Sequence, residues 1–320
     1  MRIGLDIGGT KIDAVAIDAH GAVTHRLRLP TGFGASEVVT SATAAVQGLA
    51  DLAGIPLHTF RSIGVGIPGV VDPANGRVSH AVNLGFADVD FGSALAVRTG
   101  LAVAVENDVN AAALGAYHAL SLRDSMAYLN LGTGLASGLV VDGQLWRGAR
   151  GAAGEIGHIP IDPAGALCPC GQRGCLETVA SGSAIARLWP TSPTHPGTTH
   201  AVAAHPAAAL FSAADRGDAR ALSVRASLAT GVASAVRLLV LSSDVDRVVI
   251  GGGLSNLGDA LLSDVTRVLV DWSGGSPFLA SLGLPSRVQL LPPDLPVAAV
   301  GAAMAGAPSP GISLATDAHR

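Results

Sequence analysis

Lysine is almost absent from this sequence, because Lys11 is the only lysine among its 320 residues, beside nineteen arginines. Basic charge is not in excess either, since the net charge is −4 and the isoelectric point is about 6.2. This balance offers no basic surface to a nucleic acid or an anionic membrane, and we expect neither as a partner. The single lysine stands in a glycine-rich segment, where its ammonium group is not interchangeable with a guanidinium group.

Long uninterrupted apolar runs are also missing, although the mean hydropathy of +0.46 is high. The charge-free end of the chain, residues 295–315, is broken by Pro296, Pro308 and Pro310. It falls short of the roughly 20 consecutive apolar residues that a membrane-spanning helix needs. The N-terminus opens on a strand-like segment at residues 3–7, without the basic and apolar regions of a signal peptide. We therefore expect no membrane segment and a cytoplasmic location.

Cysteine is scarce as well, and the three cysteines all lie in the segment Cys168-Pro-Cys170-Gly-Gln-Arg-Gly-Cys175. No cysteine remains outside it, so a disulfide framework is not expected. His158 lies ten residues upstream, and three thiolates with one imidazole are a ligand set of a closed, structural zinc site. Three unrelated buried thiols are the alternative interpretation. Glu155 and Glu177 flank the ligands, and a bound metal would hold these two carboxylates rigid.

Two glycine-rich turns each follow an apolar strand-like run. The first is Asp6-Ile-Gly-Gly-Thr-Lys11, and the second is Leu131-Gly-Thr-Gly134. Glycines let backbone N–H groups approach an anion closely, and an acid beside them suits a magnesium ion held through water. Each turn alone also fits a plain tight hairpin, but two such turns in corresponding places are able to hold a polyphosphate between them. Gly251-Gly-Gly253 offers flat backbone for a base or ribose, or is a crowded strand-to-helix turn.

Asn107 and Asp108 come at the end of a predicted strand, where a helix is predicted to begin. A helix cap is one interpretation, because a helix N-terminus favours side-chain acceptors and negative charge. The other is a general base aimed at a ligand, since α/β folds bind ligands at the carboxyl ends of their strands. Transfer of a phosphoryl group to an alcohol requires such a base for the hydroxyl proton.

The chain is predicted to contain two α/β lobes that each begin with a hairpin and later add a parallel strand ending at glycines. The expected boundaries are residues 1–117 plus a helix at 296–306 for the small lobe, 118–295 for the large lobe with the zinc loop, and a flexible tail at 307–320. Predicted strands cover residues 3–7, 12–17, 23–29, 63–67, 101–105, 126–131, 139–141, 144–146 and 248–250. Predicted helices run from a Ser36 cap to 52, and over 109–120, 218–241, 254–272 and 296–305, with an exposed excursion at 190–207.

These motifs together resemble the ROK family of sugar kinases, repressors and open reading frames. The resemblance covers the chain from Asp6 to about Ala305. Its most specific parts are Gly154-Glu-Ile-Gly-His158 followed by Cys-x-Cys-Gly-x-x-Gly-Cys-x-Glu, and Glu106-Asn-Asp-Val-Asn110 followed by Ala-Ala. It implies an α/β, two-lobed actin-like or hexokinase-like ATPase fold, a duplicated ribonuclease H-like architecture, which closes over a sugar and ATP.

Carried over by position, the resemblance implies that Asp108 is the general base for the sugar hydroxyl. The sugar ligands that it implies are Gly69, Asn107, Asp108, Glu155, His158 and Glu177. The residues implied around phosphates, magnesium and adenosine are Asp6, Gly8, Gly9, Thr10, Lys11, Gly132, Thr133, Gly134, Gly251, Gly252 and Gly253. The implied zinc ligands are His158, Cys168, Cys170 and Cys175, so His158 would use one ring nitrogen for zinc and the other for the sugar. Ala136 and Ser137 stand where family members often have glycines, and their side chains are expected to crowd the second phosphate turn.

The resemblance implies ATP- and Mg²⁺-dependent phosphorylation of glucose to glucose 6-phosphate, with a structural zinc ion and a dimer or tetramer of the chain. N-acetylmannosamine, N-acetylglucosamine and fructose remain alternative acceptors, and polyphosphate remains an alternative donor. A sugar-sensing regulator without catalysis is the alternative of another class. Repressors of this type carry a helix-turn-helix domain before the first glycine turn, which here begins at residue 8. We expect the kinase, because the base, the phosphate turn and the sugar ligands are all intact.

Overall fold

The computed structural model describes residues 1–190 and 206–306. The chain divides into two compact units, which are Met1–Gly115 together with the segment that starts at Pro296 (unit 1), and Ala116–Leu295 (unit 2). The predicted tail at 307–320, and the predicted excursion from residue 191 to 205, lie outside the described residues. The predicted end of the excursion, at residue 207, is wrong, because Pro206 begins a helix and Ala207 is buried.

Unit 1 is built on a five-stranded sheet in the order β3-β2-β1-β4-β8. Its first three strands are antiparallel neighbours, whereas β4 and β8 run parallel to β1. The strands are β1 (Arg2–Ile7), β2 (Lys11–Ile17), β3 (Val23–Pro30), β4 (Ile63–Ile67) and β8 (Val103–Asn107). A separate sheet holds β5 (Val70–Asp72), β6 (Arg77–Ala81) and β7 (Phe86–Asp90). The predicted N-terminal hairpins are confirmed, and the small sheet was not predicted.

Unit 2 repeats this topology with the order β11-β10-β9-β12-β13. Again two antiparallel pairs are followed by two parallel pairs. The strands are β9 (Met126–Leu131), β10 (Leu135–Val141), β11 (Gln144–Leu145), β12 (Arg247–Gly251) and β13 (Val288–Leu290). The matching orders confirm the predicted duplication, and they place the two glycine turns at the same point, between the first and second strand of each sheet.

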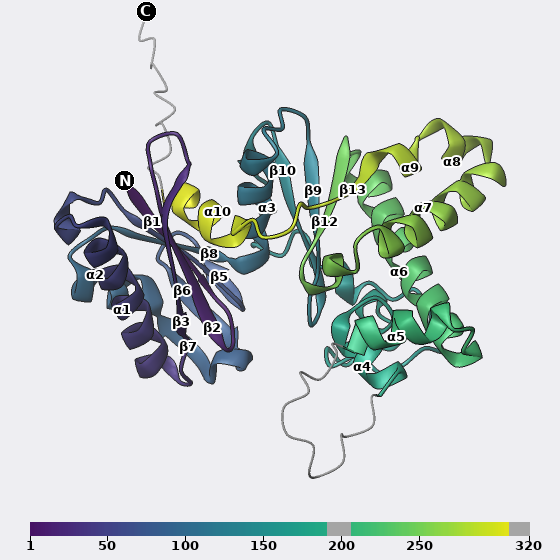
Figure 1. Cartoon of the computed structure of the whole chain (residues 1–320), viewed down its shortest axis with the longest axis horizontal. Helices are drawn as coiled ribbons and strands as arrows, with labels where there is room; N and C mark the ends of the chain where they lie inside the picture. The colour runs from purple at the N-terminus through teal and green to yellow at the C-terminus, as the bar shows by residue number, and fades with distance from the viewer. Residues whose placement is uncertain (191–205, 307–320) are drawn as a thin grey trace, which may run out of the picture. The chain divides into compact units, whose positions relative to one another are not determined.

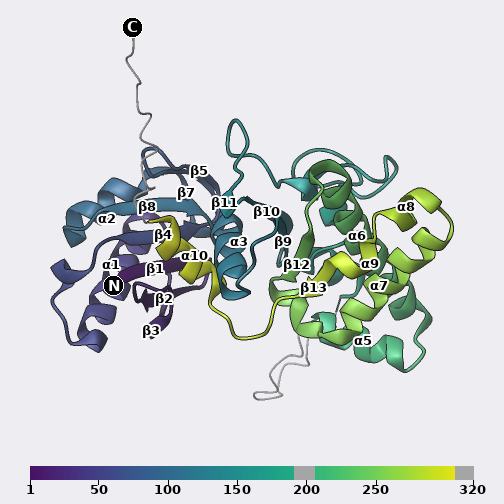
Figure 2. The same ribbon diagram turned by 90° about the horizontal axis from the view of Figure 1, so that it is seen from above.

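Helices cover the sheets, and Figure 1 labels them. They are α1 (Ala35–Ala53), α2 (Phe91–Thr99), α3 (Asp108–Ala119), α4 (Gly182–Leu188), α5 (Pro206–Asp215), α6 (Ala219–Ser243), α7 (Asp259–Gly274), α8 (Pro277–Ser281), α9 (Leu284–Arg287) and α10 (Val297–Ala305). Short 3₁₀ turns are η1 (Leu57–Thr59), η2 (Val82–Leu84), η3 (Ile156–His158), η4 (Leu176–Thr178) and η5 (Gly253–Leu257). Figure 2 shows α5 to α9 gathered on one side of the unit 2 sheet.

The predicted Ser36 cap of the first helix is wrong. The N-cap of α1 is Gly34, which has no side chain to accept a hydrogen bond. Glu37 supplies the acceptor instead, because its Oε2 accepts the backbone N–H of Phe33 at 3.1 Å. A glutamate three residues into a helix commonly reaches back in this way, and Ser36 is already inside the first turn.

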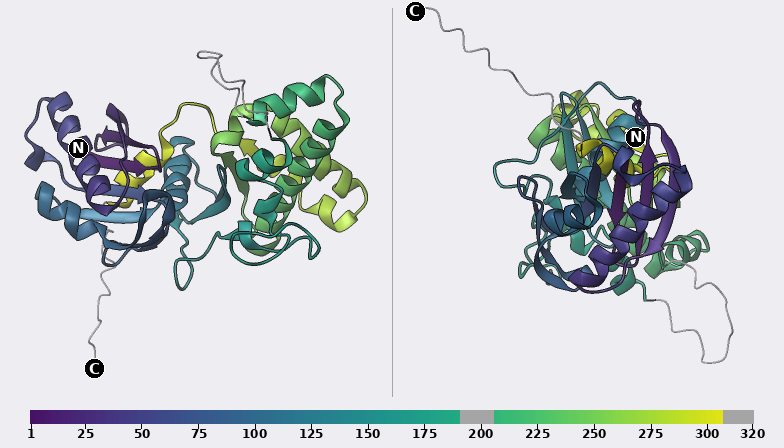
Figure 3. Two further views of the ribbon diagram at one scale, coloured as in Figure 1. Left: turned by 90° about the horizontal axis from the view of Figure 1, so that it is seen from below. Right: turned by 90° about the vertical axis from the view of Figure 1, so that its left-hand side faces the viewer.

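The C-terminal helix α10 belongs to unit 1 because it packs against β1 and β4. Figure 3 shows this yellow helix beside the purple N-terminal strands. Glycines allow the close approach, since a Cβ at Gly4 would lie 1.9 Å from the carbonyl oxygen of Ala299, and one at Gly64 would lie 1.7 Å from that of Ala302. Any larger residue at these two positions would push the helix off the sheet.

Helix α6 is apolar and long enough to span a membrane by length and composition alone. A little over half of its most apolar window, 56%, is buried inside the protein. The residues that it buries, among them Leu228, Val232, Val236 and Leu239, belong to the hydrophobic core of unit 2. Its apolar character is therefore used in packing within the unit.

Candidate functional site

The first glycine turn joins β1 to β2 and leaves its polar groups exposed. The turn is closed by the N–H of Gly8, which donates to the carbonyl of Lys11 at 3.0 Å. Thr31 supports it from within the protein, because its buried hydroxyl donates to the carbonyl of Gly8 at 2.6 Å and its N–H donates to the carbonyl of Thr10 at 3.2 Å. Gly9, Thr10 and Lys11 are exposed on this support. The turn is thus held rigidly while its donors face outward.

Asp6, just before the turn, sits in an unfavourable place for a negative charge. The pKa of Asp6 is raised to about 7, first by burial and then by the nearby carboxylates of Asp108 and Asp13, while Lys11 opposes the rise. Asp13 is itself neutralised by Arg26 and Arg28, whose guanidinium groups donate to it at 2.6–3.0 Å. Burial acts to raise the pKa of Asp13, but these two arginines outweigh burial and lower it. A divalent cation at Asp6 would relieve this repulsion.

Replacing Asp6 by Asn should therefore change how stability depends on pH. Between about pH 4 and pH 7 the folded wild type retains a proton at Asp6 that the unfolded chain has lost, so its stability falls as pH rises. The Asn variant has no proton to lose at this position, so its stability does not fall for this reason. Its free energy of unfolding, relative to wild type, should rise by about 2–4 kcal/mol from pH 4 to pH 8 in magnesium-free buffer. Urea denaturation across this range measures the difference, and a pH-independent difference would contradict the assignment.

The junction of β8 and α3 presents Asn107 and Asp108. The side-chain oxygen of Asn107 accepts the N–H groups of Val109 and Asn110 at 2.9 and 3.2 Å, as a helix N-cap does. Its amide nitrogen donates to the carbonyl of Gly69 at 3.4 Å. The predicted cap is therefore present, but at Asn107, and it leaves Asp108 as the first residue of α3.

Glu106 supports this junction from inside the protein. It is 3% exposed, and its Oε1 accepts the N–H of Asn107 at 3.1 Å and the side-chain amide of Asn110 at 3.0 Å. Two outer members of the Glu-Asn-Asp-Val-Asn motif thus hold each other across the first turn of α3. The geometry explains the motif, because it fixes the backbone on which Asp108 is carried.

The second glycine turn joins β9 to β10 and is held from several sides. Within it, the N–H of Gly132 donates to the carbonyl of Gly134 at 3.1 Å. The start of α4 contacts it next, since the N–H groups of Gly182 and Ser183 donate to the carbonyls of Gly132 and Thr133 at 2.8 and 3.1 Å. This turn borders a cavity of about 570 Å³, within the size range of small-molecule sites. Its lining residues are Gly132, Thr133, Gly182, Ser183, Ala186, Pro206, Gly253 and Leu254.

The three glycines after β12 differ in what they do. A Cβ at Gly251 would lie 2.1 Å from the hydroxyl oxygen of Tyr128, and Gly252 has a φ of 81° with Leu131 packed against it. These two are required by packing and backbone conformation. Gly253 has nothing within 4 Å of a Cβ position and lines the cavity. Gly251 and Gly252 therefore fit the interpretation of a crowded turn, whereas Gly253 offers the open backbone surface that a base or ribose would need.

The Gly-Glu-Ile-Gly-His segment packs on the beginning of β10. A Cβ at Gly154, where φ is 98°, would lie 1.8 Å from the carbonyl oxygen of Ser137, and one at Gly157 would lie 2.0 Å from that of Leu135. Both glycines are needed for this contact, which presents Glu155 at the surface and His158 half-buried. Ser137 is buried and donates its hydroxyl to the carbonyl of Gly154 at 3.2 Å. Neither Ala136 nor Ser137 is among the residues that line the cavity.

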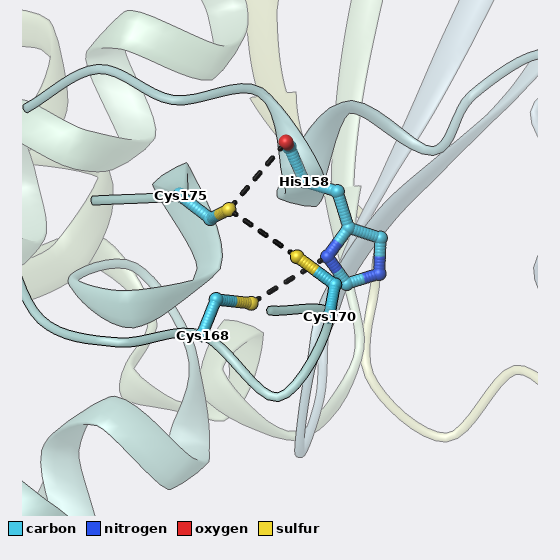
Figure 4. A group of neighbouring side chains, drawn as sticks. All are labelled: His158, Cys168, Cys170 and Cys175. Atoms are coloured by element: carbon cyan, nitrogen blue, oxygen red, sulfur yellow. Dashed lines mark hydrogen bonds between the residues drawn. The ribbon is translucent and has the colours of Figure 1, made fainter. Parts of the chain in front are cut away.

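The predicted metal ligands do come together (Figure 4). Ligand atoms of His158, Cys168, Cys170 and Cys175 all lie within 4.8 Å of one another. The Sγ atoms of Cys170 and Cys175 are 3.6 Å apart, and Nδ1 of His158 is 3.7 Å from Sγ of Cys168. Two thiolates bound to one zinc ion at about 2.3 Å are separated by roughly 3.8 Å in a tetrahedron. The donor set and its spacing therefore fit zinc, and the cysteines are not unrelated core thiols.

The thiols of this cluster differ in acidity in a way that favours a bound cation. The N–H of Gln172 is the largest of the causes that lower the pKa of Cys170 to about 6. Burial, followed by the neighbouring Cys170 and Cys168, raises the pKa of Cys175 to about 12. One thiolate therefore forms readily, whereas the others need a positive ion nearby.

The residues predicted to hold the sugar are divided between the two units. Gly69, Asn107 and Asp108 lie in unit 1, and Glu155, His158 and Glu177 lie in unit 2. Sequence reasoning missed Thr31, and it missed Gly182 and Ser183 beside the second turn. Ser181 gave a usable signal, because its side chain accepts the N–H of Ala184 as the N-cap of α4. Thr31 gave none, since its contact spans 23 residues along the chain.

Comparisons with known proteins bear on this site. The model of the ROK family matches residues 2–279. A glucokinase of Halalkalibacterium halodurans is 36% identical over 289 residues, which is 83% of this chain and 84% of that protein. An N-acetylmannosamine kinase of Yersinia pestis is 32% identical over 79% of this chain and 82% of its own length. The crystal structure of a ROK family glucokinase from Streptomyces griseus, in complex with glucose and AMPPNP, is similar with a TM-score of 0.74 and 31% identity, covering 95% and 98% of the two chains.

Proposed function

This chain belongs to the ROK family, and we propose that it is a sugar kinase that transfers the γ-phosphoryl group of ATP to glucose, giving glucose 6-phosphate. The predicted two-lobed, actin-like or hexokinase-like fold is confirmed by the duplicated sheets and by the similarity to ROK kinases. The observation that carries the proposal is the position of Asp108 as the first residue of α3, directly after the N-cap Asn107. The alignment of most of this chain with a glucokinase supports it.

We propose Asp108 as the general base of the reaction. The sugar hydroxyl oxygen attacks the γ-phosphorus, the bond from that phosphorus to the β–γ bridging oxygen breaks, and the hydroxyl proton passes to Asp108. Asn107 and Gly69 would contact the sugar from the same unit, since the amide of Asn107 already donates to the Gly69 carbonyl. Glu155, His158 and Glu177 of unit 2 are the other side chains that we propose as partners for the sugar hydroxyls.

We propose that the two glycine turns hold the donor. Gly8, Gly9, Thr10 and Lys11 would contact phosphates through N–H groups, a hydroxyl and an ammonium group, while Gly132, Thr133 and Gly134 would do so from unit 2. The cavity that includes Gly253 would take the adenosine. Asp6 would hold Mg²⁺, which neutralises phosphate charge when bound. Burial first, and then repulsion from Asp108 and Asp13, raise the pKa of Asp6, and both effects support a cation there.

We propose a structural zinc ion at His158, Cys168, Cys170 and Cys175. Four protein ligands leave no open position on the metal, so zinc would supply rigidity to the loop and not a reactive water. Nδ1 of His158 is directed at Sγ of Cys168, and Nε2 points away from that sulfur (Figure 4). We propose that Nε2 contacts a sugar hydroxyl. We also propose, from the family resemblance and the reduced thiols, a cytoplasmic homo-oligomer.

A kinase for N-acetylmannosamine is the second candidate, because a relative of that name is 32% identical over 79% of this chain. N-acetylglucosamine and fructose remain further acceptors, and a regulator without catalysis remains the alternative of another class. The proposed sugar ligands do not separate these acceptors by their chemistry.

Release of ADP by the purified protein, with ATP and magnesium, tests the proposal across hexoses, N-acetylhexosamines and fructose. We expect kcat/KM for glucose to exceed that for every other sugar by at least about tenfold, a difference of about 1.4 kcal/mol in transition-state binding. Polyphosphate in place of ATP forms a second arm with glucose as acceptor, and this arm is followed by formation of glucose 6-phosphate because it releases no ADP. A stronger preference for N-acetylmannosamine would replace the substrate, and binding of sugar without turnover with either donor would favour the regulator.

A further inference from the structure

Glu177 is bonded to the second glycine turn, although the proposed function uses it only for the sugar. Its Oε2 accepts the backbone N–H of Leu135 at 2.8 Å, and Leu135 is the residue that directly follows the turn. The contact is tight, because a Cβ at Gly134 would lie 2.4 Å from the same oxygen. Among the described residues, Leu135 supplies the only hydrogen bond given to this carboxylate, so Oε1 is left for a ligand.

The backbone around Glu177 is itself fixed. The hydroxyl of Ser181 donates to the carbonyl of Glu177 at 2.8 Å, and the hydroxyl of Thr178 donates to that of Cys175 at 2.7 Å. A Cβ at Gly157 would lie 3.5 Å from the Cβ of Glu177, so the Glu177 side chain runs from the segment that carries His158 to the glycine turn, where its carboxylate lies. A side chain that is fixed in this way also fixes the position of the groups that bind to it.

Three residues of one short segment therefore contact the same turn. Glu177 accepts from Leu135, and Gly182 and Ser183 donate to the carbonyls of Gly132 and Thr133. Gly132 and Thr133 line the cavity proposed for the nucleotide. Any change at Glu177 that releases Leu135 thus acts on residues that border the donor, without passing through the sugar.

We propose that Glu177 is a positioning residue for the phosphoryl donor as well as a sugar ligand. One oxygen fixes the second glycine turn and the other receives the sugar, so a single carboxylate aligns the donor with the acceptor. This inference rests on the proposed function, because it assumes that the turn holds phosphates. It predicts that loss of the acceptor at position 177 weakens nucleotide binding even when no sugar is present.

The test measures the dissociation constant of a non-hydrolysable ATP analogue with Mg²⁺, by calorimetry without sugar, and then the KM for glucose. Glu177→Ala removes the acceptor for Leu135, and we expect it to raise the dissociation constant of the analogue about tenfold. Glu177→Gln retains an acceptor oxygen for Leu135, and it should bind the analogue within about threefold of wild type while its KM for glucose rises. Glu177→Asp keeps the charge but is one methylene shorter, so it should behave as the alanine variant does and serves if that variant does not fold.

Glu155→Ala is the matched control, because it removes the other proposed sugar carboxylate of unit 2. Because Glu155 is a proposed sugar ligand, the KM of the Glu155→Ala variant for glucose should rise. Among the described residues no hydrogen bond joins Glu155 to the turn, so this variant should bind the analogue as wild type does. The proposal is overturned if folded Glu177→Ala or Glu177→Asp binds the analogue as wild type does, or if Glu177→Gln loses as much affinity as they do. Failure of the wild type to bind the analogue would instead remove the proposed function, and this inference with it.

Discussion

Asp108→Asn is expected to lower kcat for glucose phosphorylation by between about 100-fold and 10,000-fold, the usual worth of a positioned general base. The asparagine side chain retains an oxygen that can accept the N–H of Val109, as Oδ1 of Asp108 does at 3.0 Å. The start of α3 should therefore stay intact, and the melting temperature should change little. Because an amide cannot take the hydroxyl proton, the loss should appear in kcat more than in the KM for glucose.

Asn107→Ala is the matched control one residue away. It removes the side-chain oxygen that accepts from both Val109 and Asn110, so it should cost about 1–2 kcal/mol of stability as a lost helix cap. Asp108→Asn lacks that cost in stability, so the pair separates loss of the base from loss of the helix cap. Because Asn107 is also a proposed sugar ligand, its variant should raise the KM for glucose, whereas loss of the base should lower kcat. Circular dichroism and steady-state kinetics on both variants measure the two effects. Turnover of the Asp108 variant within tenfold of wild type would remove Asp108 as the base.

Loss of the proposed zinc ion, by chelation or by Cys168→Ser, is expected to lower the melting temperature by about 10 °C or more. Structural zinc contributes its binding free energy directly to folding, and a loop with few apolar contacts of its own has little to replace it. Cys168 Sγ faces Nδ1 of His158 at 3.7 Å, so the loss also frees the imidazole. We therefore expect the KM for glucose to rise together with the loss of stability.

Arg173→Ala is a suitable control for this prediction, because Arg173 is an exposed residue of the same loop and is not a ligand in the cluster. It should retain zinc and melt close to wild type. Metal analysis of the purified protein and differential scanning calorimetry, with and without chelator, provide the readouts. A protein that contains no zinc and melts at an unchanged temperature after chelation would contradict the structural zinc ion.

Several elements of the fold were missed because their sequence signals are local and weak. Helix α2 has nine residues and includes Gly92, and it is begun by Asp90, whose side chain accepts the N–H of Ser93. Strands β5 to β7 are short and form a sheet of their own, so alternation along the chain was too brief to indicate them. Helix α5 follows a Pro- and Ala-rich segment that resembles a loop in composition, but Leu210 and Phe211 of this helix join the core of unit 2.

The sequence by itself determined which side chains are candidates for the chemistry of the site, because residue types and their spacing are local properties. Three cysteines and His158 indicated the metal cluster, two glycine turns indicated phosphate binding, and Asn107-Asp108 indicated the base. Only the tertiary structure decided which neighbours hold these groups. Glu177 on Leu135 is separated by 42 residues and Thr31 on Gly8 by 23, and no periodicity along a chain encodes such pairs. They form only when strands and turns pack, which is why the support of the two glycine turns came from the fold.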